Sequence, residues 1–443
     1  MTFSALDGQR IAVWGVGRET RSFARHVADK LPDARITMLV LDEAAEVDGE
    51  FGAARVVLAA EAIVALADCD VLVRSPGVSI HRPEIVALRA QGLPVATPTG
   101  LWLAERKGRR VVGVTATKGK STTATIAFHV ASAAGTTAHL AGNIGAPALD
   151  LLDHDQEDLA IVELSSYQIA DLACGPEVAL VGNLYKEHVQ WHGTEAVYRA
   201  EKLRLLTLPG VRRCVVNAKV RELLAAPRAG ELRTFGTPEG WHVLERGVRR
   251  GEGPVVPTDG FPLPGPHNRL NLCAALTAVE AADAPLPEDL PGVLRGVEPL
   301  RHRLEPVHEH AGVLWVDDSI STTPESAIAA IASYPNRPVL LIGGGLDRGQ
   351  EHHQLGRVLA SRGATVIGMP DTGGRLLQAA RAAGVQADRA LTAADLSQAV
   401  ALAASAAAPG AVVLLSPAAP SFHAYINYEA RGDHFAALVR GGG

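Results

Sequence analysis

One stretch of the chain arranges glycine, lysine and hydroxyl side chains as phosphate-binding loops do. Residues 113–124 read GVTATKGKSTTA, between a short apolar run and a helix-compatible run. Glycine leaves the backbone open to a phosphate, and the N–H groups at the start of the helix point at the anion. Lysine adds a positive charge, and a serine or threonine hydroxyl can bind Mg²⁺. The predicted ATP contacts in this loop are Gly113, Thr115, Thr117, Lys118, Gly119, Lys120, Ser121 and Thr122.

The spacing of this loop departs from the commonest phosphate-binding motif. That motif has about four residues between its first glycine and Gly-Lys, whereas five residues separate Gly113 from Gly119. The departure indicates a less common class of nucleotide-binding loop.

A carboxylate is predicted beside the loop. A strand is predicted to end at Glu163, the second residue of the stretch VELSSYQI (162–169). Mg²⁺ needs a hard oxygen ligand next to the phosphate oxygens, and a glutamate at the end of a neighbouring strand supplies one. A strand-end glutamate alone is more often a surface residue, but the nearby loop favours a metal site that includes Ser121 and Glu163.

Strands that alternate with alanine-rich helices must position these residues. Apolar runs lie at 11–14, 35–42, 54–60 and 71–78, and such alternation predicts a parallel, doubly wound α/β sheet. The turn Gly15-Val16-Gly17 after the first run could hold a nucleotide phosphate, or could be no more than a tight turn between strand and helix.

Two further units follow in the sequence. Residues 227–265 predict short strands and turns, residues 267–282 a helix, and Pro324 the first turn of another helix. We predict three α/β domains: an N-terminal Rossmann-like domain (1–104), a central phosphate-loop domain (105–301) and a C-terminal Rossmann-like domain (302–443).

Composition excludes several classes of protein. The 443 residues carry a net charge of -6, which argues against a nucleic-acid binder, and no apolar run reaches the length of a membrane span. The four cysteines form no CxxC pair and predict reduced side chains. We therefore expect a soluble cytoplasmic protein.

The loop spacing, of the form GxTxTxGKST, resembles that of the Mur ligase family, which are ATP-dependent ligases of peptidoglycan precursors. Ala116 stands where the family usually has glycine. GNIGAP (142–147), VELSSYQI and NLYKEHVQWHG (183–193) also look like family segments, and the resemblance covers nearly the whole chain. SPAAPSFHAYINYEARGDHF (416–435) is similar to the glutamate-adding, MurD-type members.

The resemblance implies roles for single residues. Two Mg²⁺ ions would be held by Ser121, Glu163, His188 and Lys202, with Lys202 carried as an anionic carbamate. Lys120, His188, Lys202 and Arg303 would be catalytic, and Asn268, Asn271, Arg303 and Asp318 would add contacts to ATP. Gly17, Arg18, Ser75, Gly77, Asn143 and Ser165 would bind the UDP substrate. Thr322, Arg348, Ser416 and Phe422 would bind glutamate.

The resemblance implies the activity as well. It predicts that glutamate is joined to UDP-N-acetylmuramoyl-L-alanine through an acyl phosphate formed from ATP, by a monomer that needs neither nucleic acid nor membrane. D-glutamate-adding enzymes commonly have a lysine in the segment that here reads DSIST, where this chain has Ile320. Together with NLYKEH and SPAAPSFHAY, this departure favours the members that add L-glutamate.

Other functions stay open at this point. A D-glutamate-adding ligase of the same family is the first alternative. A folate-type polyglutamate ligase shares the ATP loop but predicts no N-terminal UDP domain. A nucleotide sensor would not need the intact set of Lys120, Glu163, His188 and Lys202, and a dehydrogenase would rest on the Gly15-Val16-Gly17 turn alone.

Overall fold

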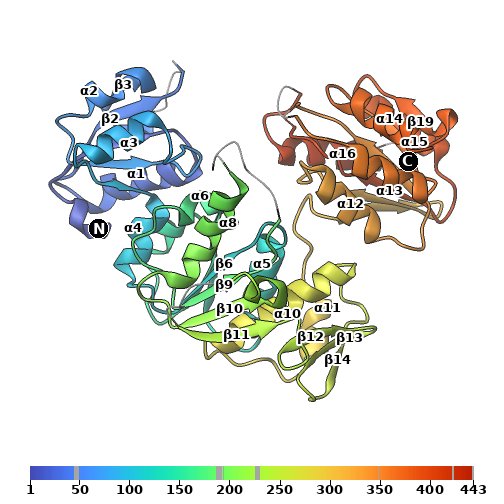
Figure 1. The fold of residues 1–443 in the computed structure, drawn as a ribbon, viewed down its shortest axis with the longest axis horizontal. Coiled ribbons are helices and arrows are strands. Elements are labelled where there is room, and N and C mark those ends of the chain that lie inside the picture. The colour runs from blue at the N-terminus through green and yellow to red at the C-terminus, as the bar shows by residue number, and fades with distance from the viewer. Residues whose placement is uncertain are drawn as a thin grey trace. The chain divides into compact units, whose positions relative to one another are not determined.

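The computed structural model describes residues 1–43, 49–185, 192, 194–224, 230–347, 349–421 and 424–441. Its contacts divide the chain into two compact units (Figure 1). The first unit contains Met1–Gly260 and His267–Gly296, and the second contains Phe261–Pro266 and Val297–Gly443.

The N-terminal part of the first unit is a five-stranded parallel sheet with the strand order β3-β2-β1-β4-β5. Residues on alternate sides of β1 enter separate cores, Ile11 and Val13 on one face and Ala12 and Trp14 on the other. Burial of both faces is typical of parallel sheets covered by helices. The strands are β1 (Arg10–Trp14), β2 (Arg35–Leu41), β3 (Arg55–Leu58), β4 (Val71–Arg74) and β5 (Val95–Ala96), and the helices are α1 (Arg18–Lys30), α2 (Ala62–Ala65), α3 (Pro83–Ala90) and α4 (Pro98–Glu105).

A second, six-stranded parallel sheet follows in the same unit, in the order β11-β10-β9-β6-β8-β7. Its strands are β6 (Val111–Thr115), β7 (Ala138–Gly142), β8 (Leu159–Glu163), β9 (Val178–Val181), β10 (Arg213–Asn217) and β11 (Glu231–Phe235). Its helices are α5 (Lys120–Ala133), α6 (Ser166–Ile169), α8 (Glu195–Arg204) and α9 (Ala218–Arg221). Leu101, Trp102 and Leu103 of α4 lie in a core that also contains residues of the first and second sheets, so the two sheets share one unit.

Residues 241–260 and 267–296 complete the first unit. The antiparallel strands β12 (Trp241–Leu244), β13 (Gly247–Arg250) and β14 (Val255–Pro257) form a small sheet. The helices α10 (Pro266–Ala281) and α11 (Leu290–Arg295) follow. The predicted short strands and the predicted helix at 267–282 are therefore confirmed.

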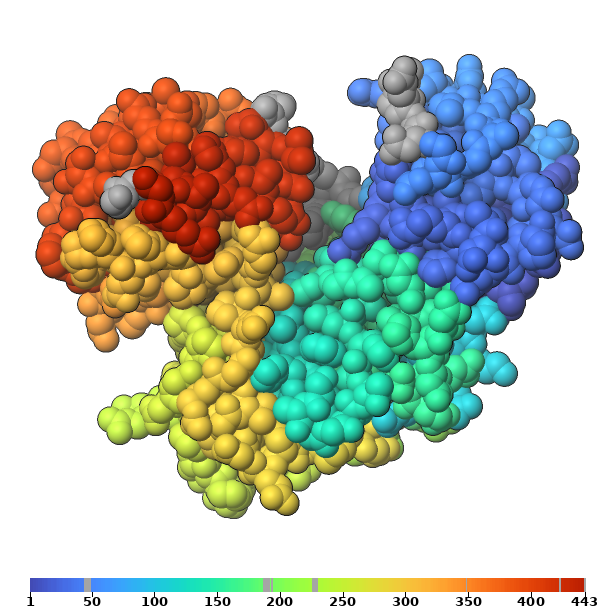
Figure 2. Space-filling model, turned by 180° about the vertical axis from the view of Figure 1, so that it is seen from behind, coloured from blue at the N-terminus to red at the C-terminus, as the bar shows by residue number. Residues whose placement is uncertain are grey.

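The second unit holds a six-stranded sheet in the order β15-β16-β20-β17-β18-β19. All neighbours pair in parallel except the edge pair β15 and β16. The strands are β15 (Glu305–His310), β16 (Val313–Asp317), β17 (Val339–Gly343), β18 (Thr365–Gly368), β19 (Ala390–Thr392) and β20 (Val412–Leu415). The helices are α12 (Pro324–Ala332), α13 (His353–Ser361), α14 (Gly373–Ala382), α15 (Leu396–Ala406) and α16 (Tyr428–Gly441), whose last residues are red in Figure 2.

The predicted α/β class with doubly wound parallel sheets is confirmed. The predicted strand at 71–78 is too long, because β4 ends at Arg74 and the SPGV segment forms a turn. Pro76 has no N–H to donate to a neighbouring strand, which favours the turn. The boundaries of three domains stay a prediction. No helix among the described residues has the length and apolar character needed to cross a bilayer.

Candidate active site

The predicted phosphate loop connects β6 to α5 at the carboxyl end of the second sheet. Gly119 caps α5 with a φ of +87°, in the left-handed region that favours glycine. A Cβ there would lie 2.4 Å from Asn271 Oδ1, so the loop backbone passes directly beside this amide. Asn271 in turn donates through Nδ2 to Asn268 Oδ1 at 3.2 Å. The structure therefore brings both predicted asparagines next to the loop, inside α10 and not at its N-cap.

Thr117 ties the loop to two neighbouring elements. Its N–H donates to Asn183 O at 2.6 Å, after the end of β9. Its hydroxyl lies 2.8 Å from the Tyr198 hydroxyl on α8 and accepts a bond from the N–H of Tyr185 at 2.9 Å. Lys120 Nζ donates to Thr117 O at 3.1 Å, so the lysine side chain curls back over the loop. These contacts tie the loop to α8 and to the segment that follows β9.

Lys202 lies under the same loop. The side chain is 1% exposed, and Nζ donates to Thr115 Oγ1 at 3.0 Å and to Ala116 O at 2.9 Å. Helix α8 carries it there from the sequence segment that follows β9. The predicted metal and catalytic lysine is therefore in contact with the predicted ATP loop.

Glu163 ends β8, the strand next to β6, and is 1% exposed. Its Oε1 accepts a bond from Asn143 Nδ2 at 3.0 Å, while Oε2 has no hydrogen-bond partner among the described residues. A buried carboxylate oxygen without a donor is costly unless a cation binds it. The oxygen donors of Glu163 and Ser121 suit Mg²⁺ in charge and hardness, so the residues present fit this ion.

Next to Lys202, Glu201 joins two histidines. His81 Nε2 lies 2.8 Å from Glu201 Oε1, and His192 Nδ1 contacts Glu201 Oε2. Buried His192 also lies 2.9 Å, through Nε2, from the hydroxyl of Ser166, which directly follows the predicted Ser165. No spacing in the sequence links His81 to Glu201, which are 120 residues apart. Its ligand atoms are close enough to hold a metal ion, but each carboxylate oxygen already contacts a histidine.

The predicted UDP-binding loops meet at the carboxyl ends of β1 and β4. The strand order reverses between these two strands, and ligands of open α/β sheets bind at such a switch point. The N–H of Ser75 donates to Trp14 O at 2.7 Å, and a Cβ at Gly17 would lie 3.3 Å from Ser75 Oγ. The loops that contain Gly17 and Gly77 thus lie side by side.

Arg18, Asn143 and Ser165 already use their polar atoms within the first unit. Arg18 donates to Gly142 O at 2.8 Å and to Gly145 O at 3.0 Å, which links α1 to the GNIGAP segment. Ser165 caps α6 and exchanges hydrogen bonds with Gln168. Their predicted contacts with the UDP substrate would add to these bonds or replace them.

In the second unit, Asp318 and Ser416 lie together at the carboxyl ends of β16 and β20. Ser416 Oγ donates to Asp318 Oδ2 at 2.7 Å, and the N–H of Leu304 donates to Oδ1 at 3.2 Å. Burial raises the pKa of Asp318 to about 6, and Arg303 opposes that rise through its charge. Asp318, a predicted contact to ATP, and Ser416, a predicted contact to glutamate, are therefore neighbours.

Arg431 of α16 is another residue that no sequence pattern predicted. It is 2% exposed and donates to Ser319 Oγ at 2.9 Å, to Ser319 O at 2.8 Å and to Ala419 O at 3.1 Å. Burial lowers its pKa to about 10. A Cβ at Gly345 would lie 3.1 Å from its NH1. One guanidinium thus contacts the loops after β16, β17 and β20, which contain the predicted glutamate residues.

Three predicted site residues, His188, Arg348 and Phe422, lie outside the residues that the structure describes. Thr322 is half-buried and directly precedes Thr323, the N-cap of α12, whose first residue is the predicted Pro324.

Comparisons with known proteins show which domains and relatives this chain resembles. Residues 114–279 match the Mur ligase middle domain, and residues 302–419 match the Mur ligase, glutamate ligase domain. A protein of Xanthomonas axonopodis pv. citri named UDP-N-acetylmuramoyl-L-alanine--L-glutamate ligase is 40% identical over 454 residues, covering 99% of this chain and 97% of its own. A protein of the same name from a Micromonospora species is 38% identical, and the match spans 99% of this chain and 98% of that protein.

Solved structures show the same fold at low sequence identity. The MurF ligase of Thermotoga maritima, solved with ADP, matches 100% of this chain and 97% of its own with a TM-score of 0.61 and 17% identity. A folylpolyglutamate synthase of Mycobacterium tuberculosis has a TM-score of 0.56 and 16% identity but matches only 75% of this chain.

Proposed function

The chain belongs to the Mur ligase family, and from that premise we propose that it joins L-glutamate to UDP-N-acetylmuramoyl-L-alanine at the expense of ATP. The observation that carries the proposal is the 40% identity along 99% of the chain to a relative that is named for this activity. The folate-type alternative is less well supported, since the folylpolyglutamate synthase matches only 75% of the chain.

The first unit supplies the groups that an ATP-dependent ligase needs. The N–H groups at the start of α5 and the charge of Lys120 would hold the phosphates in the loop. Asn271, which packs against Gly119, would limit how the loop can move. Thr117 would keep the loop attached to α8, and therefore to Lys202.

Ser121, Glu163, His188 and Lys202 would hold Mg²⁺ in two sites, with Lys202 as a carbamate. The support from this chain is the buried Glu163 Oε2, which has no hydrogen-bond partner among the described residues, and the position of Lys202 at the loop. When bound, the ions would neutralise the phosphate charge of ATP. The lysine side chain, by contrast, carries a positive charge of its own, and a carbamate would replace that charge with oxygen ligands.

The reaction that follows has two steps. The carboxylate of the alanyl substrate attacks the γ-phosphorus of ATP, giving an acyl phosphate and ADP. The amine of glutamate then attacks the acyl carbon, an amide forms, and inorganic phosphate leaves. Lys120 and Arg303 would stabilise the charge of the transferred phosphoryl group, and exclusion of water would protect the acyl phosphate.

L-Glutamate is favoured over D-glutamate by the names of the relatives and by Ile320 in the segment DSIST. Ser416, Thr322, Arg348 and Phe422 are the proposed glutamate contacts, and Asn268 and Asp318 the proposed nucleotide contacts beyond the loop. The cytoplasmic location, the monomeric state and a contribution to cell shape and division stay predictions.

A direct assay tests the proposal. Purified protein is incubated with ATP, Mg²⁺ and UDP-N-acetylmuramoyl-L-alanine, with L- or D-glutamate in separate tubes, and phosphate release and the new amide are followed. The Lys120→Ala variant is the matched control for contaminating ATPase. Turnover with L-glutamate alone supports the proposal, turnover with D-glutamate alone overturns the choice of glutamate, and turnover with neither overturns the ligase function.

A further inference from the structure

A buried arginine stands at the end of β4, directly before the SPGV turn. The Arg74 side chain is 0% exposed, and charged side chains are almost never fully buried unless they are paired. The contacts of this guanidinium therefore show what its burial serves.

Arg74 binds the turn that follows it. Its NH1 donates to Val78 O at 2.8 Å, to Pro76 O at 3.2 Å and to Ser75 O at 3.3 Å. One cation thus fixes three carbonyl groups within a stretch of four residues. Carbonyl direction determines peptide orientation, so the shape of residues 75–78 depends on this side chain.

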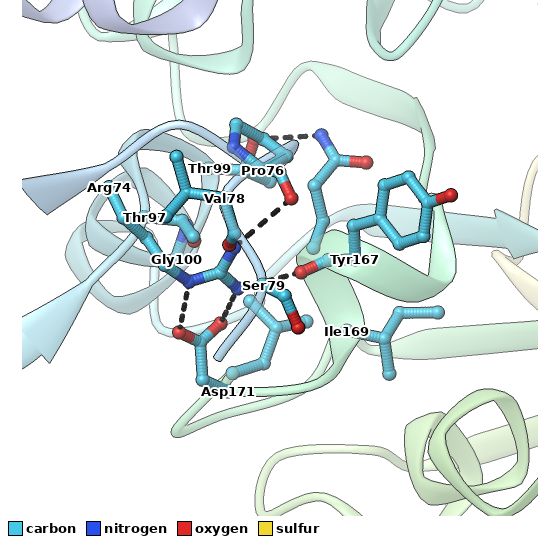
Figure 3. A network of polar contacts seen from close by, with 12 residues as sticks. Arg74, Pro76, Val78, Ser79, Thr97, Thr99, Gly100, Tyr167, Ile169 and Asp171 are labelled. Carbon is cyan, nitrogen blue, oxygen red and sulfur yellow. Dashed lines mark hydrogen bonds and ion pairs between the residues drawn. The ribbon is translucent and has the colours of Figure 1, made fainter. Parts of the chain in front are cut away.

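The other edge of the guanidinium binds a different part of the first unit. Arg74 Nε donates to Asp171 Oδ2 at 2.9 Å and NH2 donates to Asp171 Oδ1 at 2.8 Å, a bidentate pair in which Asp171 is 5% exposed. NH2 also donates to Tyr167 O at 2.7 Å. Figure 3 shows Arg74 reaching from the end of its strand toward Asp171 and the backbone of Tyr167.

The segment that contains Tyr167 and Asp171 comes directly after Glu163 and Ser165 in the sequence. Arg74 therefore joins the turn at the switch point of the first sheet to the segment that leaves the candidate metal carboxylate. Bidentate arginine–carboxylate pairs are strong and geometrically specific, and lysine cannot reproduce them.

We propose that Arg74 is a positioning residue for the UDP substrate: it holds the 75–78 turn in its binding shape and fixes it against the 165–171 segment. The inference rests on the proposed function, because it takes the turn as part of the UDP site. It extends that proposal to a residue that does not itself need to touch the substrate.

The experiment compares Arg74→Lys with Arg89→Ala. Arg89 NH2 donates to Asp171 Oδ2 at 3.1 Å, the oxygen that also accepts from Arg74 Nε, but the Arg89 side chain is 35% exposed. Removing Arg89 weakens the ion-pair cluster, while the three hydrogen bonds from Arg74 to the turn remain. Steady-state kinetics would give kcat and the separate KM values for UDP-N-acetylmuramoyl-L-alanine and ATP, and calorimetry would give the affinity for the UDP substrate.

For Arg74→Lys we expect the KM for the UDP substrate to rise by about tenfold or more, while the KM for ATP changes by less than about twofold. Arg89→Ala should change both values by less than about twofold. If Arg74→Lys does not fold, Asp171→Asn keeps the size of the partner but removes its charge, and the UDP-substrate KM should again rise selectively.

An unchanged KM for the UDP substrate in a folded Arg74 or Asp171 variant would overturn the inference. An equal rise in both KM values would also overturn it, since that result indicates a general loss of structure. If the unmodified protein fails to bind the UDP substrate at all, the proposed function fails instead, and the two failures are thereby distinguished.

Discussion

Glu163→Gln should make the metal-free protein more stable and nearly inactive. Glu163 is 1% exposed, and only its Oε1 has a described hydrogen-bond partner, Asn143. An unsatisfied buried polar group costs about 1–3 kcal/mol, and more when it is charged. The neutral amide keeps an acceptor for Asn143 but removes the charge, so we expect a gain of about 1 kcal/mol. That gain would raise the Tm by about 2 °C in a unit of this size.

The response to Mg²⁺ should change in the opposite direction. A ligand at about 100 times its Kd stabilises the folded state by about 2.7 kcal/mol, so Mg²⁺ should raise the Tm of the unmodified protein by several degrees. The variant should lose most of that response, and its kcat should fall by about 100-fold or more, as expected when several kcal/mol of charge stabilisation is removed. Thermal unfolding with and without Mg²⁺, together with phosphate release, measures all three effects.

Glu19→Gln is the matched control. Glu19 is buried as well, but Gln168 Nε2 and Thr99 Oγ1 donate to its two oxygens at 2.7 and 2.8 Å. This variant should gain no stability and should keep the Mg²⁺ response. A metal-free Glu163→Gln protein that melts below the unmodified one, or that responds to Mg²⁺ equally well, would refute the reasoning about the unpartnered oxygen.

Four further predictions concern the remaining site residues. Lys202→Met should lower kcat by about 100-fold, and removing dissolved CO2 from the buffers should slow the unmodified enzyme, because a carbamate forms from CO2; phosphate release measures both. Ile320→Lys should reduce the ratio of kcat/KM for L- over D-glutamate by about tenfold, measured with each isomer. Arg431→Met should destabilise the second unit by about 3 kcal/mol in urea unfolding and raise the KM for glutamate more than that for ATP, because it leaves buried acceptors without a donor. The hydrogen bond that His302 donates to the Asp317 carboxylate raises the pKa of His302, so this pair stabilises the fold fully below the unfolded pKa of about 6.5 and loses that contribution as pH rises through the folded pKa. The free energy of unfolding, measured at a series of pH values, should show this loss. In the His302→Gln variant that pH dependence should disappear.

Each of these expectations has a clear contrary result. Full activity of Lys202→Met would remove the lysine from the metal site. An unchanged isomer ratio in Ile320→Lys would separate residue 320 from glutamate selection. Equal changes in both KM values for Arg431→Met would indicate a role in stability alone, and an identical pH profile for His302→Gln would mean that the His302–Asp317 pair does not link stability to pH.

Local features of the sequence predicted the parts of the site that are local in structure. A strand, a glycine turn and a helix occupy consecutive residues at the phosphate loop, so Gly119 and Lys120 could be placed from their neighbours alone. The strand-end position of Glu163 is local in the same sense. The prediction of Lys202 as a site residue depended on a family resemblance, because no local pattern links α8 to the loop after β6.

Long-range pairs explain what could not be predicted. Arg74 and Asp171 are 97 residues apart, and His81 and Glu201 are 120 residues apart. Neither pair has a periodicity or spacing that links its members, since sheet order and helix placement bring them together. The insertion of β20 between β16 and β17, on which the contact of Ser416 with Asp318 depends, is equally invisible in a local pattern.

The contact between Arg431 and Ser319 has a consequence for how the chain is made. The two residues are 112 residues apart, so a ribosome finishes the loop after β16 long before the helix that holds it. At about 5–20 residues per second, the loop waits about 6–20 s for its guanidinium. For most of that interval β20 is also missing, and α16 is unfinished throughout it. Chaperones that bind unfinished sheets would therefore meet this unit mainly in that period. A chain that ends before Arg431 would lack the guanidinium that contacts the loops after β16, β17 and β20.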